Sequence, residues 1–276
     1  HCAKLYDAAT CAAWGASQSV NATFFDSLAA AGYNVTVMGK VDVGADILRR
    51  YPGAVADGFH GGPSLSILTR AADIRKPTKK NPLAITNQHD DNVHPEDWKT
   101  IERCIEWLND PAPTTTPWFL YCSLNIPHPP FNTNATWLAS VNESLVGVPP
   151  WADATNASRH AHPYDSYMSI SKAVDGSFTQ QQIRKVRATY YAMSSETDYM
   201  LGRVLAAAGA HPAYSNTFVI FLSDHGEMNM EHRQVWKNSF YEASARVPLI
   251  VSGGALPDTV RGTVVTDLVS LLDVYP

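Results

Sequence analysis

The chain has 276 residues, 45% of them hydrophobic and 17% charged, and its 26 acidic against 21 basic residues give a formal net charge of −5. This composition excludes a disordered chain, and the length suits one large domain or two small ones. The mild acidity argues against a nucleic-acid or membrane-surface partner, which needs a basic face, and no apolar run approaches the ~18 residues of a membrane span.

Helical and strand-like patterns alternate along the chain. From 178 to 208 apolar side chains recur every three or four residues, which predicts a long helix. Residues 218–222 are continuously apolar, which predicts a buried strand. The other expected elements are a helix over 17–31, a strand over 33–38, a loop region over 51–93, a helix that starts at Pro95 and ends at Asp110-Pro111, strands over 118–124 and 247–251, and a polar surface excursion over 132–177.

Helices that alternate with fully apolar strands predict an α/β fold, with a largely parallel sheet sandwiched between helices. In such folds ligands bind just beyond the carboxyl ends of the strands. This rule selects three places in the sequence, at Gly39-Lys40, at 125–130 and at 223–225.

Asp224 and His225 directly follow a predicted buried strand. A carboxylate and an imidazole at a strand end can ligate a divalent cation, and Gly226 permits a sharp turn there. The alternative is an ordinary loop. Lys237, twelve residues beyond His225, could bind an anionic substrate, although a lone lysine is more often a surface residue.

His128 stands between two prolines, which restrict the backbone and stiffen the loop. A histidine on a stiff loop suits a general acid, and the alternative is a structural histidine. Lys40 is a second candidate anion ligand at a strand end, and the alternative for it is again a surface lysine. Each candidate alone also has an ordinary structural explanation, but all of them follow predicted strand ends and can therefore belong to one site.

Together these residues resemble the type I sulfatases of the alkaline phosphatase superfamily. The resemblance follows the family's order and spacing across nearly the whole chain, and one branch of the family shares further motifs, including an Asp at position 42 where many sulfatases have a His. The family motifs are Gly39-Lys40, Asn-Ile-Pro-His-Pro over 125–129, Ser-Asp-His-Gly-Glu over 223–227, Lys237 and 241–249, and the branch motifs are 39–42, 190–193, 196–198 and 230–234.

The resemblance implies an alkaline phosphatase-like sulfatase domain that hydrolyses sulfate esters. It implies that Asp224 and His225 ligate Ca²⁺. It also implies that Lys40 and Lys237 bind the sulfate oxygens, and that His128 contacts the sulfate and helps to protonate the leaving oxygen. Cations suit this chemistry because charge must be stabilised on both the transferring group and the leaving oxygen.

The chain departs from the family pattern at the nucleophile. The family uses a formylglycine made from the Cys of a C-x-P-S-R motif, and neither Cys2 nor Cys11 stands in such a motif. The family's first strand, which supplies an Asp pair to the Ca²⁺, would precede the first residue, and its C-terminal subdomain would follow the last. Residues 1–276 are therefore expected to be a single, incomplete sulfatase catalytic domain that is inactive by itself.

Three functions fit this sequence. The first is a sulfuric ester hydrolase acting on a sulfated carbohydrate, which the branch resemblance narrows to a 2-O-sulfated hexuronate of a glycosaminoglycan. The second is a phosphodiesterase or phosphonate hydrolase of the same superfamily, although a second set of Asp and His metal ligands is not visible. The third is a non-catalytic glycan-binding pseudoenzyme, which the missing nucleophile motif permits. The oligomeric state stays open.

Five N-x-[ST] sequons indicate a secretory route, lysosomal or extracellular. Glycosylation is expected at Asn21, Asn134, Asn142 and Asn156, whereas Asn34 lies in a strand-like run. The four cysteines are too few for a disulfide scaffold and show no CxxC spacing, so their pairing stays open.

Overall fold

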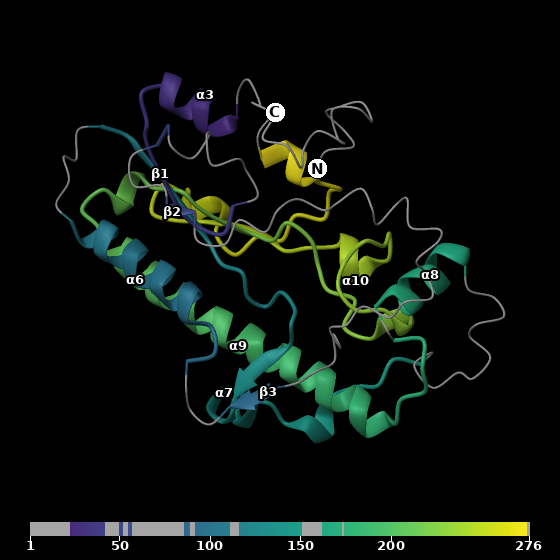
Figure 1. Cartoon of the computed structure of the whole chain (residues 1–276). Helices are drawn as coiled ribbons and strands as arrows, with labels where there is room; N and C mark the ends of the chain where they lie inside the picture. The colour runs from purple at the N-terminus through teal and green to yellow at the C-terminus, as the bar shows by residue number, and fades with distance from the viewer. Residues whose placement is uncertain are drawn as a thin grey trace.

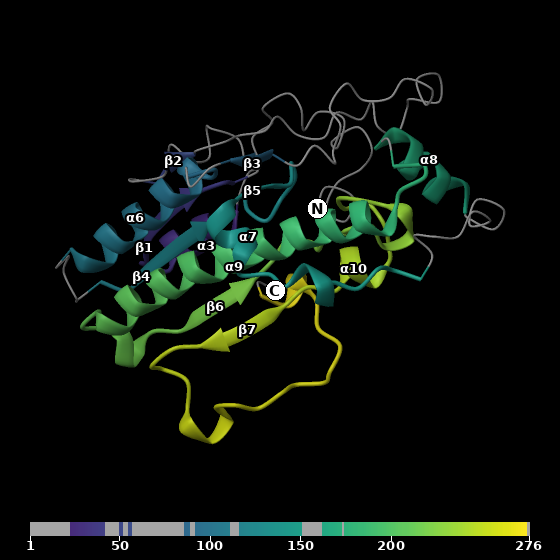
Figure 2. The same cartoon turned by 90° about the horizontal axis from the view of Figure 1, so that it is seen from below.

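The computed structural model describes residues 23–41, 50–51, 55–56, 86–88, 92–110, 116–150, 162–172 and 174–274. Figures 1 and 2 show its arrangement from two sides. The helices are α3 (Phe24–Ala30), α6 (Pro95–Asn109), α7 (Ala135–Ala139), α8 (Pro163–Ser171), α9 (Gln180–Ala210) and α10 (Glu242–Ala245). The strands are β1 (Asn34–Gly39), β2 (Val55–Ala56), β3 (Thr86–Gln88), β4 (Trp118–Ser123), β5 (Asn132–Asn134), β6 (Val219–Leu222) and β7 (Leu249–Ser252). Short 3₁₀ turns lie at Glu143–Leu145, Tyr214–Asn216, Glu231–Arg233, Asp258–Val260 and Leu271–Val274.

A three-stranded parallel sheet has β1 in its centre, between β2 and β4. Successive side chains of a strand point to opposite faces, and β1 is buried on both of them. Val35 and Val37 belong to a core cluster with Phe25 of α3. Met38 lies on the other face, where its sulfur is 3.6 Å from Sγ of Cys104 on α6. The predicted parallel sheet between helices is therefore confirmed for these three strands.

The long helix α9 lies alongside α6 in both views (Figures 1 and 2). It begins with a capping box formed by Thr179 and Gln182, and its buried face packs with Ile101 of α6. Glu196 is also buried on that face, where its Oε1 accepts a hydrogen bond of 2.8 Å from Nε1 of Trp98. The long helix predicted over 178–208 is confirmed, although it begins and ends two residues later than predicted.

The prediction for β6 and β7 is wrong in two respects. The two strands pair antiparallel with each other, and among the described strands neither pairs with β1 or β4. They are also not buried, since Ile220 is 49% exposed and Ile250 is 55% exposed. Figure 2 shows the two strands side by side. An apolar run makes a strand suitable for burial, but neighbours far away in the sequence decide whether it is covered and in which direction it pairs.

The polar region over 132–177 is not only a surface excursion. It contains α7, α8 and strand β5, which pairs in parallel with β3. Met168 and Val174 are almost completely buried, at 1% and 0% exposure. Isolated apolar residues of this kind anchor a segment without producing the periodic pattern from which a helix or strand is predicted.

The start of α3 gives a prediction about pH. Thr23 and Asp26 form a capping box, and the hydroxyl of Tyr51 donates a short hydrogen bond to Oδ1 of Asp26. This bond is the main reason why the pKa of Asp26 falls from 3.8 to about 2. A carboxyl whose pKa is lower in the folded state adds stability above its unfolded pKa and loses it as the pH falls toward the folded value.

We therefore expect Tyr51→Phe to raise the pKa of Asp26 toward 3.8 and to lower the free energy of unfolding at pH 7 by about 1 kcal/mol. The difference in unfolding free energy between the two proteins should shrink between pH 4 and pH 2. NMR titration of the Asp26 carboxyl and urea unfolding at several pH values measure these effects. An unchanged Asp26 pKa in Tyr51→Phe would contradict the assignment.

Candidate active site

The ends of β1 and β4 lie together at one edge of the parallel sheet. Lys40 directly follows β1, and its backbone N–H donates a 3.2 Å hydrogen bond to the carbonyl of Ser123, the last residue of β4. Gly39 has a φ of +89°, and a Cβ at this position would lie 1.8 Å from the same carbonyl oxygen. Only glycine allows the two strand ends to approach so closely, and this approach brings Lys40 to the loop that carries His128.

The loop after β4 is held by the first turn of α6. The carboxylate of Asp97 accepts hydrogen bonds from the backbone N–H groups of Asn125 at 2.6 Å and Ile126 at 3.3 Å. Ile126 is itself buried in the core cluster shared with α9. Asp97 therefore fixes the backbone that presents His128. Nothing in the sequence marked Asp97, which has the ordinary pattern of an acidic residue in the first turn of a helix.

His128 and Lys237 are direct neighbours. Nδ1 of His128 donates to the carbonyl of Pro129 at 2.6 Å, so its Nε2 accepts a hydrogen bond from Nζ of Lys237 at 3.3 Å. Burial, followed by the positive charge of Lys237, lowers the pKa of His128 to about 4. Lys40 acts in the same direction. The imidazole is therefore neutral near pH 7.

Asp224 and His225 form a second pair beside His128. The ring centroids of His128 and His225 are 6.2 Å apart. Nδ1 of His225 donates to the carbonyl of Gly226 at 2.8 Å. Its Nε2 is buried, has no hydrogen-bond partner among the described residues and lies 3.4 Å from Oδ2 of Asp224. Burial lowers the pKa of His225, which favours the neutral ring.

This arrangement fits part of a metal site. A ligating histidine commonly donates its second ring N–H to a backbone carbonyl, as His225 does to Gly226, and turns the other nitrogen to the metal. The Asp224 carboxylate suits Ca²⁺, whereas an imidazole nitrogen is a ligand that transition metals also accept. Within the described ranges no group of three or more His, Cys, Asp or Glu side chains is placed to hold a metal. Among those residues Asp224 and His225 could thus supply two donors to a metal, and their role as ligands stays a prediction.

Gly226 has a different role from the predicted sharp turn. A Cβ at Gly226 would lie 2.1 Å from the carbonyl oxygen of Ala243 in α10, and its backbone N–H donates to the carbonyl of Ser244 at 2.8 Å. The missing side chain allows the segment after β6 to lie directly against α10. This contact fixes the backbone next to His225.

The segment over 227–238 folds back on itself and presents Lys237. The carboxylate of Glu227 accepts backbone N–H bonds from Asn229 at 3.1 Å and Trp236 at 2.5 Å, and burial raises its pKa to about 7. The segment contains an unusual run of non-glycine residues with positive φ, which needs strong support from its surroundings. These residues are Asn229, Met230, His232, Arg233, Trp236 and Asn238. The buried side chains of Met228, Met230 and Val235 supply that support.

The structure thus brings His128, His225 and Lys237 together, with Oδ2 of Asp224 3.4 Å from Nε2 of His225 and with Lys40 near enough to lower the pKa of both histidines. Their roles stay predictions. Sequence reasoning missed the residues that hold this group in place, Asp97 and Glu227, and it also missed Lys172, which lies over the ring of Trp236.

The predicted glycosylation sites differ in their surroundings. Asn142 is exposed, and its Oδ1 accepts hydrogen bonds from the backbone and hydroxyl of Ser144. Asn134 is only 7% exposed, and its Oδ1 caps α7 by accepting from the N–H of Trp137, which argues against a glycan there. Other residues of the sequence analysis lie outside the described part of the chain, namely Cys2, Cys11, Asn21, Asp42 and Asn156.

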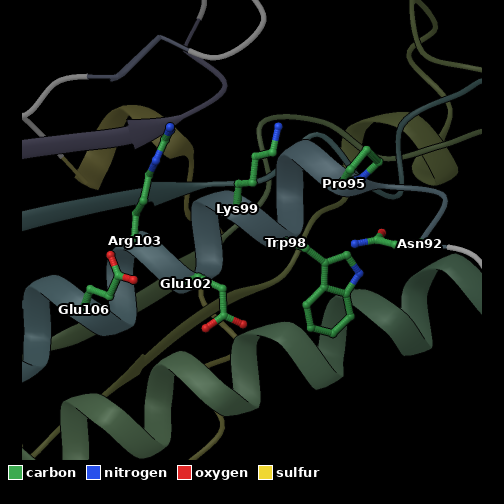
Figure 3. Close-up of a pocket in the computed structure, with 7 residues that line it drawn as sticks. All are labelled: Asn92, Pro95, Trp98, Lys99, Glu102, Arg103 and Glu106. Carbon is green, nitrogen blue, oxygen red and sulfur yellow. The ribbon is translucent and has the colours of Figure 1, made fainter.

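A pocket runs along α6 and is lined by Asn92, Pro95, Trp98, Lys99, Glu102, Arg103 and Glu106. Figure 3 shows Trp98 and Glu102 pointing toward α9, whereas Lys99 and Arg103 point away from it. Glu102 pairs with Arg203 of α9 across this face. All of its lining residues belong to α6 or directly precede it, and none of the predicted site residues is among them, so this pocket is not the candidate active site.

No helix in the described ranges is both long and apolar enough to cross a membrane. The cysteines of those ranges, Cys104 and Cys122, carry free thiols. Neither of them is among the residues that contact His128 in the candidate site, such as Lys237 and His225. The interaction with Cys122, followed by burial, raises the pKa of the Cys104 thiol, which favours its protonated form.

The chain resembles known proteins in sequence. Residues 5–276 match the family model described as Sulfatase. Arylsulfatase K of Homo sapiens is 38% identical over 206 residues, which are 70% of this chain and 37% of that protein. Arylsulfatase K of Danio rerio is 34% identical over 272 residues, 92% of this chain and 48% of that protein. The chain thus spans less than half the length of these relatives, and arylsulfatase K is the branch whose motifs the sequence shares.

Solved structures share the fold. A phosphonate monoester hydrolase of Agrobacterium radiobacter aligns with a TM-score of 0.60 at 24% identity, over 86% of this chain and 54% of that one. A 2-O GAG sulfatase aligns with a TM-score of 0.54 at 20% identity, over 86% and 47%. These neighbours identify the alkaline phosphatase-like sulfatase fold. The family match over nearly the whole chain, joined to the identity with arylsulfatase K, shows that the chain belongs to the sulfatase family.

Proposed function

We propose that the chain carries the sulfate-binding part of a sulfuric ester hydrolase that acts on a sulfated sugar. The observation that carries this proposal is the contact of 3.3 Å between Nζ of Lys237 and Nε2 of His128, beside the Asp224–His225 pair. A sulfate ester carries its negative charge on non-bridging oxygens. A lysine, a histidine and a metal ligand pair in one place are the groups that such an anion requires.

Each residue of the cluster has a role in this proposal. Lys40 and Lys237 bind the sulfate oxygens and orient the ester. His128 contacts the same group and donates a proton to the leaving oxygen. Its low pKa reflects burial and nearby cations, so an anion bound beside it raises that pKa and favours the protonated ring. His128 is then able to act as an acid when substrate is present.

The metal of this site is Ca²⁺ in our proposal. Members of the sulfatase family typically bind a divalent metal, and the unpartnered Nε2 of His225 beside the Asp224 carboxylate supports such a site here. Asp224 and His225 would hold the ion together with further ligands. When bound, the ion would supply positive charge that polarises the sulfate group.

The substrate is a 2-O-sulfated hexuronate of a glycosaminoglycan in this proposal. Similarity to arylsulfatase K supports it, and one structural neighbour is a 2-O GAG sulfatase. The protein acts in the secretory pathway, in lysosomes or outside the cell. The exposed sequon at Asn142 agrees with that route.

The complete gene product tests this function. It is expected to release sulfate from an aryl sulfate and from a 2-O-sulfated uronate, to lose activity with a chelator and to regain it with Ca²⁺. Asp224→Ala should raise the Ca²⁺ concentration for half-maximal activity by more than about tenfold, because a metal ligand is lost. Asp258→Ala is the matched control, since its carboxylate is 96% exposed on a 3₁₀ turn.

The other two functions give different results in the same assay. Faster hydrolysis of a phosphonate monoester than of any sulfate ester would favour a phosphonate hydrolase. Binding of the sulfated sugar without any turnover would favour a glycan-binding pseudoenzyme. Restoration by Mn²⁺ or Zn²⁺ but not by Ca²⁺ would contradict the metal assignment while leaving the reaction class intact.

A further inference from the structure

A further cationic group lies beside the residues assigned to the sulfate. Lys172 directly follows α8, and its Nζ is 3.6 Å from the centroid of the Trp236 ring. The ring of Trp236 is 6.1 Å from the ring of His128, and Trp236 directly precedes Lys237 in the chain. The Lys172 ammonium is thus separated from the sulfate-binding cluster by a single aromatic side chain.

The position of Lys172 is fixed by contacts between α8 and the segment over 227–238. The Asp165 carboxylate on α8 accepts hydrogen bonds from Nε2 of Gln234 at 3.0 Å and from the hydroxyl of Tyr241 at 2.7 Å. Helix α8 ends where the backbone N–H of Lys172 bonds back to its last turn. The ammonium therefore extends from a held backbone and rests on a held ring, unlike the end of a flexible surface side chain.

The charge of Lys172 is not balanced within the described part of the chain, where no carboxylate forms an ion pair with it. Glu227 is the carboxylate that interacts electrostatically with Lys172, and it already accepts hydrogen bonds from two backbone N–H groups. Burial, followed by the charge of Lys237, lowers the pKa of Lys172 to about 8. The indole face compensates for part of this cost, and a bound anion would compensate for the rest.

The geometry points to Lys172 as the residue that binds the carboxylate of a hexuronate substrate and so determines specificity for an acidic sugar. This inference rests on the proposed sulfatase function. The sulfate ester already has Lys40, His128 and Lys237, so a cation one ring away suits a second anionic group of the same molecule. A pyranose carries its C2 oxygen and its C5 carboxylate on opposite sides of one ring, and a single sugar can therefore reach both positions.

Three substrates distinguish this role from a structural one. They are a 2-O-sulfated glucuronide, its methyl ester, in which the carboxylate is neutral, and an aryl sulfate. A charge-assisted contact predicts that the complete wild-type protein prefers the acid over the ester by about 10–100-fold in kcat/KM. In Lys172→Met this preference should fall close to one, and Lys172→Arg should restore most of it. Lys185→Met, an exposed lysine of α9, is the control and should keep the full preference.

The outcomes separate the inference from the proposed function. If Lys172→Met lowers kcat/KM for acid and ester equally, or if the wild type does not distinguish them, the carboxylate role is wrong although the sulfatase function stands. If the wild type releases no sulfate from any of the three esters, the proposed function fails. Calorimetry with the 2-O-sulfated glucuronide then decides about Lys172. Binding that is lost in Lys172→Met and kept in Lys185→Met supports the inference, and binding that is equal in both or missing in the wild type overturns it.

Discussion

Replacing Lys237 by alanine is expected to lower sulfate-ester turnover in the complete protein by about 10²–10³, or roughly 3–4 kcal/mol of transition-state stabilisation. The ammonium lies against Nε2 of His128 in a half-buried position, so it stabilises charge on the sulfate oxygens better than water does. The backbone that carries Lys237 is held by Glu227 and by buried methionines, and none of these contacts uses the lysine side chain. The fold should therefore survive the substitution.

Steady-state kinetics together with thermal unfolding measures this effect. Lys99→Ala is the matched control, because its side chain is 58% exposed on α6 and pairs only with the neighbouring Glu96 among the described contacts. A surface lysine of that kind should change stability by no more than about 0.5 kcal/mol and leave turnover unaltered. If Lys237→Ala keeps more than about half of the wild-type turnover with an unchanged melting curve, the anion site is assigned wrongly.

The local sequence pattern predicts the part of the site that lies at the ends of two strands. Strands over 33–38 and 118–124 are apolar enough to be parallel and buried, and their register places Gly39 opposite Ser123. The rule that ligands bind beyond such ends therefore selects Lys40 and the His128 loop for a physical reason. Lys237 is different, because no periodicity relates it to the sheet. Its position twelve residues beyond His225 made it a candidate anion ligand, and the family resemblance assigned it to the sulfate.

The sequence could not reveal what holds these groups in place. Asp97 and Glu227 accept hydrogen bonds from backbone N–H groups that the fold brings to them, from Asn125 and Trp236 respectively. In the sequence alone, an acidic residue that will bind such groups cannot be distinguished from an ordinary acidic residue of a helix turn or loop. The same reason explains the error about β6. Its apolar residues suit burial, but its only described partner strand is β7. Long-range contacts decide such questions, and a single sequence does not contain them explicitly.

The surroundings of Lys172 also depend on long-range contacts that a single sequence does not reveal. Lys172 lies in a polar stretch that has the composition of a surface loop, and its neighbours in sequence give no sign of a site. Its surroundings become visible only when α8 packs against the segment before Lys237 and brings Trp236 under the ammonium. The specificity of an enzyme is often carried by such excursions, because they vary while the strand ends that hold the reacting group stay fixed.

His128→Ala is expected to lower turnover of a sugar sulfate by about 10²–10⁴, the range for loss of a positioned general acid. The loss should be smaller for an aryl sulfate with an acidic phenol, because such a leaving group departs without a proton. Turnover of both substrates should be compared in wild type, His128→Ala and His211→Ala. His211 is the matched control, since it caps the end of α9 against Trp118, away from the His128 cluster. Equal losses on the two substrates would contradict the acid role and leave only sulfate binding.

The double variant Lys237→Ala/His128→Ala then tests whether the two residues act as one unit. Their side chains share a hydrogen bond, and the charge of Lys237 helps to hold the pKa of His128 down. Removing Lys237 alone therefore leaves His128 without its hydrogen-bond donor and with a higher pKa. Removing His128 alone likewise leaves Lys237 without this acceptor, so each single variant disturbs both sulfate binding and proton donation. We expect the double variant to lose little more than the worse single variant, about 10²–10⁴, instead of the product of the two losses. Fully multiplicative losses would show two independent groups, and the contact of 3.3 Å would then not be the feature that organises the site.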